Sequence, residues 1–193
     1  MSDFKRLIVL SSPSGGGKST LAKHMMKLYP GLEFSISATT RKIREGETDG
    51  KDYFFLTRDE FEDRIKKGDL VEYEEIFGNL YGTLRSEIKR SVDKGNTMLF
   101  DVDVKGAVSL RDSFPDQSLL IFIYPPNMEE LENRLRNRRT ETDEEVRRRL
   151  SRAKEELTYK DQFDHTILND KLEKALNEIE IIAEKYIDPQ LRG

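Results

Sequence analysis

The stretch that most constrains the fold is RLIVLSSPSGGGKST, residues 6–20. Its apolar run, residues 7–10, predicts a short buried strand. A serine- and glycine-rich turn follows, and Lys18 then opens an amphipathic segment that predicts a helix. Strand, glycine loop and helix together indicate a phosphate-binding P-loop, because glycines let backbone N–H groups converge and the helix N-terminus adds a positive dipole. The sequence therefore predicts a nucleoside triphosphate site.

Within this loop the residue types suit the parts of a triphosphate. Lys18 is expected to reach the outer phosphates, and the Ser19 hydroxyl is expected to bind Mg²⁺. Ser12 stands where the pattern has its first glycine, but this position closes the strand and offers phosphate no side chain. A glycine-rich connection without a ligand is the alternative, and the Lys-Ser-Thr run argues against it. The predicted loop contacts to the nucleoside triphosphate are Ser14, Gly15, Gly16, Gly17, Lys18, Ser19 and Thr20.

A second apolar run, residues 97–102, leads into the carboxylates of Asp101 and Asp103. An acidic group at the carboxyl end of a parallel strand lies close to the Mg²⁺ of a P-loop protein. We therefore expect Asp101 to bind this ion through a water molecule, with Mg²⁺ as the one predicted cofactor.

Strands and helices alternate through most of the chain, which predicts a doubly wound parallel α/β sheet. Periodicity is lost over residues 37–84, where a loop, a strand, a short helix and a hairpin are expected. The predicted division is a core of residues 1–36 and 85–193 with a small mixed α+β insertion of residues 37–84. The core strands and helices after the insertion are expected at residues 86–93, 97–102, 119–124, 128–136, 144–160, 166–168 and 172–186.

Composition narrows the class of protein. The chain has 193 residues, a net charge of -4, no cysteine and equal hydrophobic and charged shares of 36%. No apolar run approaches the ~18 residues of a membrane span, and a signal peptide is not expected, so we predict a cytoplasmic protein without a membrane partner. The basic stretch between residues 134 and 152 is interrupted by acidic residues and lacks aromatics, which argues against nucleic acid.

Three arginines are candidates for a phosphate clamp. Arg134 and Arg138 are four residues apart and share a flank of the apolar face of one predicted helix. Arg149 lies on the flank of the apolar stripe of the next helix. The polar segment between the two helices, residues 137–143, is expected to be mobile.

With these residues in view, the chain closely resembles the guanylate kinases, which are P-loop enzymes that act on ATP and GMP. The resemblance extends from residue 7 to about residue 182. Each of its motifs is weak alone, and the set is specific. Beyond the P-loop it rests on SATTR (37–41) with Arg44, GKDY (50–53), Glu72, GNLYGT (78–83), DVD (101–103) with Gly106, RRTE (138–141) and ND (169–170).

The resemblance implies a division of labour. Residues 37–84 would be the GMP-binding domain, and residues 137–147 a lid over ATP. Arg41, Arg44, Tyr53 and Tyr81 would grip the GMP phosphate. Guanine would be read by Ser37, Glu72, Thr83 and Asp103. The triphosphate side would add Arg134, Arg138, Arg149, Asn169 and Asp170, with Asn169 near adenine. The implied catalytic residues are Lys18, Arg44, Arg138 and Arg149; Arg139 departs from the family pattern, where a smaller or uncharged residue is common.

The chemistry of guanine supports this assignment independently. Guanine presents N1–H and its exocyclic amine as adjacent donors, and one carboxylate accepts both. Adenine N1 is a bare acceptor, so its lone pair would face the negative charge of Glu72. A polar site of this kind can reject the wrong base by about 10⁴-fold or more.

The expected activity is Mg²⁺-dependent transfer of the ATP γ-phosphoryl group to GMP or dGMP, giving ADP and GDP. One alternative is a non-catalytic guanylate-kinase-like module that binds protein ligands, which Lys18, Ser19 and the clamp arginines argue against. The other is a P-loop kinase of a different small phosphorylated substrate, which Glu72 with Ser37 and Thr83 argues against. The oligomeric state is left open, as a monomer or a small homo-oligomer.

Overall fold

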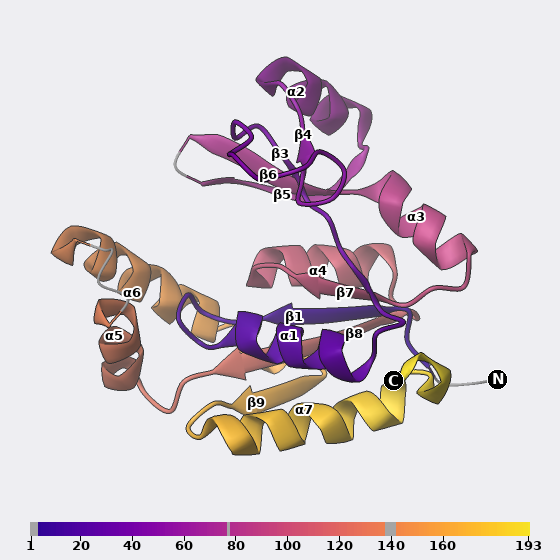
Figure 1. Cartoon of the computed structure of the whole chain (residues 1–193). Coiled ribbons are helices and arrows are strands. Elements are labelled where there is room, and N and C mark those ends of the chain that lie inside the picture. The colour runs from indigo at the N-terminus through magenta and orange to yellow at the C-terminus, as the bar shows by residue number, and fades with distance from the viewer. Residues whose placement is uncertain (1–3, 77, 138–141) are drawn as a thin grey trace.

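The computed structural model describes residues 4–76, 78–137 and 142–193 (Figure 1). Its centre is a five-stranded sheet in which every strand pair is parallel. The spatial order is β2 (Glu33–Phe34), β7 (Met98–Asp101), β1 (Leu7–Ser11), β8 (Ser118–Tyr124) and β9 (His165–Leu168). The predicted parallel sheet is thereby confirmed, and the P-loop leaves the carboxyl end of its middle strand.

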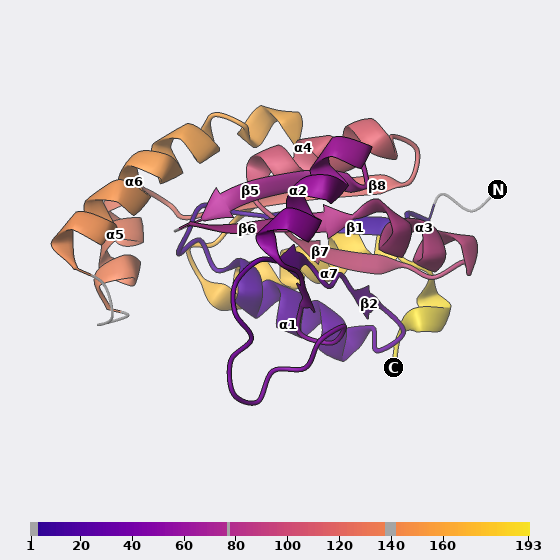
Figure 2. The same cartoon turned by 90° about the horizontal axis from the view of Figure 1, so that it is seen from above.

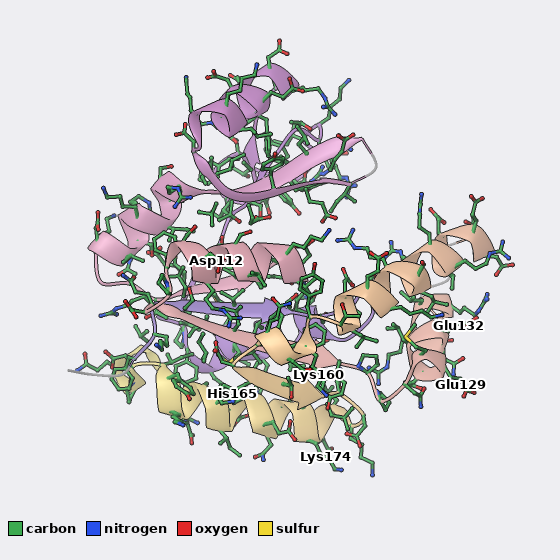
Figure 3. The ribbon with its side chains drawn as sticks, turned by 180° about the vertical axis from the view of Figure 1, so that it is seen from behind. Asp112, Glu129, Glu132, Lys160, His165 and Lys174 are labelled. Carbon is green, nitrogen blue, oxygen red and sulfur yellow. The ribbon has the colours of Figure 1, made fainter. Side chains whose placement is uncertain are left out.

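Helices cover both faces of this sheet, as a doubly wound fold requires. On one face α1 (Lys18–Leu28) and α7 (Leu172–Tyr186) pack against strand residues such as Ile8 and Ile121. On the other face α3 (Arg85–Asp93) and α4 (Val104–Ser113) pack against residues such as Val9 and Phe122. Charged side chains such as Asp112, Glu129 and Lys174 project outward from the helices (Figure 3).

Residues 37–84 form a second, four-stranded sheet beside the first. Its order is β4 (Phe54–Phe55), β3 (Ala38–Thr39), β6 (Asn79–Leu84) and β5 (Leu70–Ile76), and α2 (Arg58–Lys67) packs on it. Its own apolar cluster consists of Ala38, Phe61, Leu70, Leu80 and Leu84. Seen from the side and from above, this insertion lies over the central sheet (Figures 1 and 2).

The last part of the core is a pair of helices, α5 (Met128–Arg136) and α6 (Asp143–Leu157), which share a small apolar cluster. Helix α6 begins at a capping box in which Thr142 and Glu145 satisfy each other's backbone N–H groups. Val146 and Ala153 are buried on its inner face, where the helical periodicity placed them. This packing fixes which arginines of α6 face the cavity described below.

The structure differs from the sequence expectations at four places. Helix α4 was not predicted, because Gly106 and the preceding carboxylates resemble a turn; its first turn is in fact capped by Asp103, which accepts a hydrogen bond from Gly106 N at 2.7 Å. The short strand β3 lies where a loop was expected. Helix α6 ends at Leu157, and short 3₁₀ turns follow at Lys160–Gln162 and, near the C-terminus, Pro189–Leu191.

Among the described residues, no helix combines the length and apolarity that crossing a membrane requires.

Candidate active site

A cavity of about 840 Å³ lies between the P-loop and the insertion. The P-loop and the end of β7 form one side, β5 and β6 contribute from the insertion, and α6 reaches in with basic side chains. Among the residues singled out in the sequence, those that line the cavity are Ser14, Gly15, Gly17, Lys18, Ser19, Thr20, Ser37, Tyr53, Glu72, Tyr81, Asp101, Asp103 and Arg149.

The P-loop conformation depends on glycine at a definite place. Gly17 immediately precedes α1 with φ of 102°, and a Cβ atom there would lie 2.1 Å from Asn169 Nδ2. Asn169 is buried and donates a hydrogen bond to Gly16 O at 2.8 Å, while its backbone carbonyl accepts one from Arg134 at 2.8 Å. The loop after β9 therefore supports the P-loop from behind.

Lys18 is held at the junction of two strands. Its ammonium group lies 2.6 Å from Asp101 Oδ1 and donates to Val102 O at 2.9 Å. Asp101 ends β7 and Val102 follows it, whereas Lys18 begins α1, so the Lys18 side chain crosses the carboxyl ends of adjacent parallel strands. The predicted proximity of the P-loop and the acidic end of β7 is therefore present in the structure.

At the far end of the cavity Glu72 lies between β6 and the first turn of α4. Thr83 donates a hydrogen bond to Glu72 Oε1 at 2.5 Å. A Cβ atom on Gly106 would come within 3.2 Å of Glu72 Oε2. Burial raises the pKa of the Glu72 carboxyl to about 7; the Thr83 hydrogen bond opposes this shift, and the charges of Asp103 and Glu74 add to it. Glu72 is thus a partly buried carboxyl poised near neutral pH.

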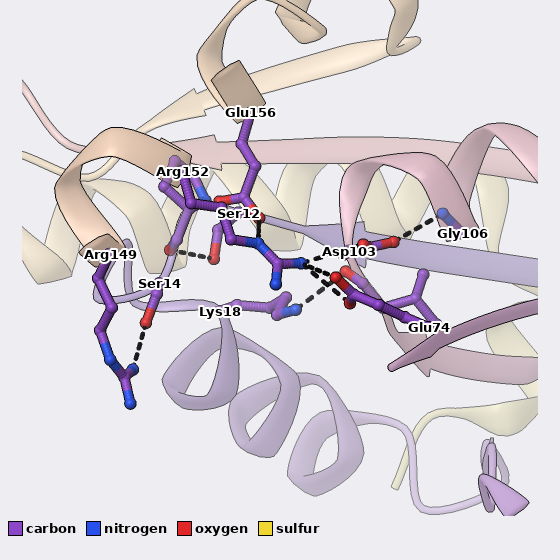
Figure 4. Close-up of polar contacts among 11 residues, drawn as sticks. Ser12, Ser14, Lys18, Glu74, Asp103, Gly106, Arg149, Arg152 and Glu156 are labelled. Carbon is purple, nitrogen blue, oxygen red and sulfur yellow. Dashed lines mark hydrogen bonds and ion pairs between the residues drawn. The ribbon is translucent and has the colours of Figure 1, made fainter. Parts of the chain in front are cut away.

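Arg152 was not predicted as a site residue, yet it lines the cavity and joins three elements (Figure 4). Its Nε donates to Glu156 on its own helix at 2.9 Å. Its terminal nitrogen binds Glu74 of β5 at 2.8 Å and Asp103 at the start of α4 at 3.2 Å. Only the i,i+4 pair with Glu156 could have been read from the sequence. Arg148, which was likewise not predicted, lines the cavity too.

The other basic cluster, in the insertion, surrounds Arg41. Its guanidinium binds Glu47 through two hydrogen bonds of 2.7 and 3.0 Å. It also lies 5.2 Å from the centre of the Tyr53 ring, which packs edge-on against Tyr81. Glu47, which the sequence reasoning missed, accepts the Arg44 backbone N–H as well. Glu47 thus orders the cationic loop, and carboxylate oxygens occupy the Arg41 fork.

Several predicted residues lie away from the cavity lining. Arg44 is exposed, and Arg41 and Thr83 contact lining residues from behind. Arg134 binds Glu130 and Asn169. Asp170 accepts the Lys171 N–H. Arg149, in contrast, lines the cavity, and it donates a hydrogen bond to Ser14 Oγ of the P-loop at 2.7 Å. Arg138 and Arg139 lie outside the described residues.

Oxygen ligands for a metal come from few side chains. Ser19 is exposed and lines the cavity, and so does Asp101 at the end of β7. Over residues 4–76, 78–137 and 142–193, no group of three or more acidic or histidine side chains is arranged to hold an ion. This donor set suits Mg²⁺, which keeps several waters and takes one or two protein oxygens beside substrate phosphates.

Comparison with known proteins gives one consistent result. The guanylate kinase family model matches residues 4–186. The curated guanylate kinase of Chlorobium luteolum is 45% identical over 94% of this chain and 92% of its own length. That of Chlorobaculum tepidum is 49% identical over 92% and 91%. A crystal structure of guanylate kinase from Anaplasma phagocytophilum superposes with a TM-score of 0.69 at 34% identity, covering 95% of this chain and 88% of that one.

Proposed function

We propose that the cavity between the P-loop and the insertion is the active site of a guanylate kinase. The premise is that the chain belongs to the guanylate kinase family and transfers the γ-phosphoryl group of ATP to GMP. One observation carries the proposal: a single cavity is lined by the P-loop lysine on one side and by Glu72 on the other. Phosphoryl transfer needs both nucleotides in one enclosed space with their reacting ends facing each other. The relatives named above are all guanylate kinases, which favours the enzyme over a protein-binding module.

We assign the triphosphate of ATP to the P-loop side. The backbone of the loop and the N-terminus of α1 supply N–H donors, and Lys18 supplies charge. Phosphate oxygens would replace Asp101 as the partner of Lys18. The residues proposed for this half are Ser14, Gly15, Gly16, Gly17, Lys18, Ser19, Thr20, Arg134, Arg138, Arg149, Asn169 and Asp170.

Mg²⁺ fits beside these groups, with Ser19 as a direct ligand and Asp101 as a ligand through water. When bound, the ion neutralises charge on the phosphates.

We assign GMP to the insertion side. Glu72, in its ionised form, would accept the two adjacent donors of guanine, and Asp103, Ser37 and Thr83 would complete base recognition. The GMP phosphate would replace Glu47 as the hydrogen-bond partner of the Arg41 guanidinium, with Arg44, Tyr53 and Tyr81 around it. Different parts of the insertion would thereby bind the base and the phosphate, with Asp103 of the core added on the base side.

The reaction itself requires no general base, because the GMP phosphate is already nucleophilic. What the chain provides is alignment and compensation of charge on the transferred group. Lys18, Arg44, Arg138 and Arg149 are the residues proposed for that compensation. Closure of the 37–84 domain and of the 137–147 lid would exclude water, which otherwise competes for the phosphoryl group. A cytoplasmic location and a monomer or small homo-oligomer stay predictions from the sequence.

A coupled assay of ADP release tests the assignment. With MgATP fixed, GMP should be turned over far faster than AMP, UMP or dTMP, and dGMP measures how closely the sugar is read. Omitting Mg²⁺ should abolish turnover. Equal rates with GMP and AMP would contradict the proposed guanine site.

A further inference from the structure

Arg152 belongs to none of the roles assigned so far, although it lines the cavity and makes three charged contacts there. Its guanidinium binds Glu74 at 2.8 Å, Asp103 at 3.2 Å and Glu156 at 2.9 Å. These partners come from the insertion, from the cap of α4 and from α6 itself. One cation therefore joins three elements that surround the base end of the cavity.

Glu74 is tied to Glu72 by strand geometry. Residues two apart on a strand point to the same face, so Glu74 and Glu72 both face the cavity while Tyr73 between them is exposed. In the β5–β6 pairing Glu72 lies opposite Thr83 and Glu74 opposite Tyr81. The contact with Arg152 thus fixes the strand position next to the proposed guanine reader.

Asp103 approaches Glu72 from the other side. Its Oδ1 caps α4 through Gly106 N at 2.7 Å, and its Oδ2 receives Arg152. A Cβ atom on Gly106 would lie within 3.2 Å of both Asp103 Oδ1 and Glu72 Oε2, so the two carboxylates share the first turn of this helix. The groups that face Glu72 are therefore Thr83 from β6, Asp103 and the Gly106 backbone from α4, and Glu74 from its own strand.

The carboxylates of Glu72, Glu74 and Asp103 repel one another at this distance. The repulsion favours protonation of Glu72, the most buried of them, and a protonated Glu72 cannot accept both donors of guanine. Arg152 contacts two of the three. Glu156, whose side chain is 9% exposed, holds its Nε side and so aims the guanidinium at the other two.

We propose that Arg152 is a positioning residue for base recognition, which holds Glu74 and Asp103 beside Glu72 and offsets their charge so that Glu72 meets guanine as a carboxylate. The inference deepens the proposed function and rests on the role given there to Glu72. Arg152 acts through its carboxylate partners and does not itself touch the base.

The test is the pH profile of kcat/KM for GMP at saturating MgATP, which reports ionisations of the enzyme–MgATP complex and of free GMP. Arg152→Met removes the charge and keeps the length. Removing one nearby cation should move the acid limb upward by about one pH unit. From a midpoint near 7, that shift gives a loss of about fivefold at pH 7 that nearly disappears by pH 9. Arg152→Lys should restore most of the profile.

Glu74→Gln separates charge from mechanics. This variant weakens the same bridge but removes a negative charge, so the limb should move the other way, by about half a unit, and raise kcat/KM near pH 6.5 about twofold. A purely mechanical tie between α6 and β5 predicts that both variants lose activity in the same direction at every pH, and this result would overturn the proposal. A pH-independent loss of kcat in Arg152→Met would make Arg152 a phosphate contact, and would overturn it as well.

Two controls complete the design. Lys154→Met removes an exposed charge from the same helix and should leave the profile unchanged; melting temperatures verify that each variant folds. Glu72→Gln should delete the enzyme's acid limb and leave only the titration of the GMP phosphate, near pH 6. If Glu72→Gln changes neither the limb nor the GMP/AMP ratio, the guanine site itself is wrong. If Glu72→Gln behaves as expected while the pH profile of Arg152→Met matches that of the wild type, the role proposed for Arg152 is wrong and the guanine site stands.

Discussion

Replacing Glu72 by glutamine is the sharpest probe of base recognition, because it changes one oxygen to an NH₂ group without changing shape. The amide oxygen can still accept the Thr83 hydroxyl, which lies 2.5 Å from the Glu72 carboxylate. The new NH₂ group would face a donor of guanine. For adenine, in contrast, the same group offers a donor to the bare N1 acceptor.

The expected loss for GMP follows from these contacts. A charge-assisted hydrogen bond disappears and a donor is left unpaired in a partly buried site, which together cost about 2–4 kcal/mol. At ~1.4 kcal/mol per decade this lowers kcat/KM for GMP about 30- to 1000-fold. AMP should lose far less or gain slightly, so the ratio of the two must fall.

The same substitution should stabilise the fold. The pKa of Glu72 is raised from 4.5 to about 7, so the folded state holds this proton more tightly than the unfolded state and ionisation opposes folding. A shift of this size corresponds to about 3 kcal/mol, and screening by solvent in the cavity reduces it to about 1–3 kcal/mol. The cost is fully present above pH 7 and is relieved as the pH falls toward 4.5.

Two measurements on one variant therefore have opposite signs. At pH 8, Glu72→Gln should melt higher than the wild type, by about 2–4 °C for each kcal/mol, while its kcat/KM for GMP collapses. Near pH 4.5 the stability difference should vanish. A variant that loses GMP and AMP activity equally, or that melts lower at pH 8 than the wild type, would refute the reasoning.

Three further outcomes are expected. Lys18→Ala should lower kcat by orders of magnitude while GMP affinity, measured by calorimetry without ATP, changes little; a near-normal kcat would exclude Lys18 from the phosphate site. Asn169→Asp places a carboxylate against Gly16 O, which now accepts at 2.8 Å, so urea unfolding should show a loss of about 2–4 kcal/mol and KM for ATP should rise. Small-angle scattering should give a smaller radius of gyration with a bisubstrate analogue than without it, because each lobe carries one substrate; identical profiles would contradict closure.

The sequence was sufficient for the central sheet and for the P-loop, because both depend on local patterns. Apolar runs of strand length and a glycine turn before Lys18 are visible within one window of residues. The helical spacing of α6 also placed Arg149 beside the buried stripe, and the structure has it against Ser14, 135 positions away in the chain. Periodicity succeeds where one element's faces decide the outcome.

What the sequence did not predict depends on contacts between distant segments. Arg152 meets Glu74 and Asp103 at separations of 78 and 49 residues, and no local pattern encodes such partners. Helix α4 was missed because Gly106 and the carboxylates before it resemble a turn. The cap at Asp103 and the packing against β5 and the central sheet show that a helix begins there. Glu72 could be suggested by its motif, but the burial that raises its pKa emerges only when α4 and β6 enclose it.

The separate apolar cluster of the insertion bears on how long the enzyme survives in a cell. Phe61 and its neighbours share no residue with the clusters on either side of the central sheet, although Val71 of β5 packs against one of those clusters. Once that contact is lost, we expect the insertion to open as a unit while the P-loop sheet remains folded. A protease would then find its first cleavage points in residues 37–84. GMP binds the closed insertion and not the open one, so it would lower the population of the open form by mass action. We therefore expect GMP to slow proteolysis of residues 37–84.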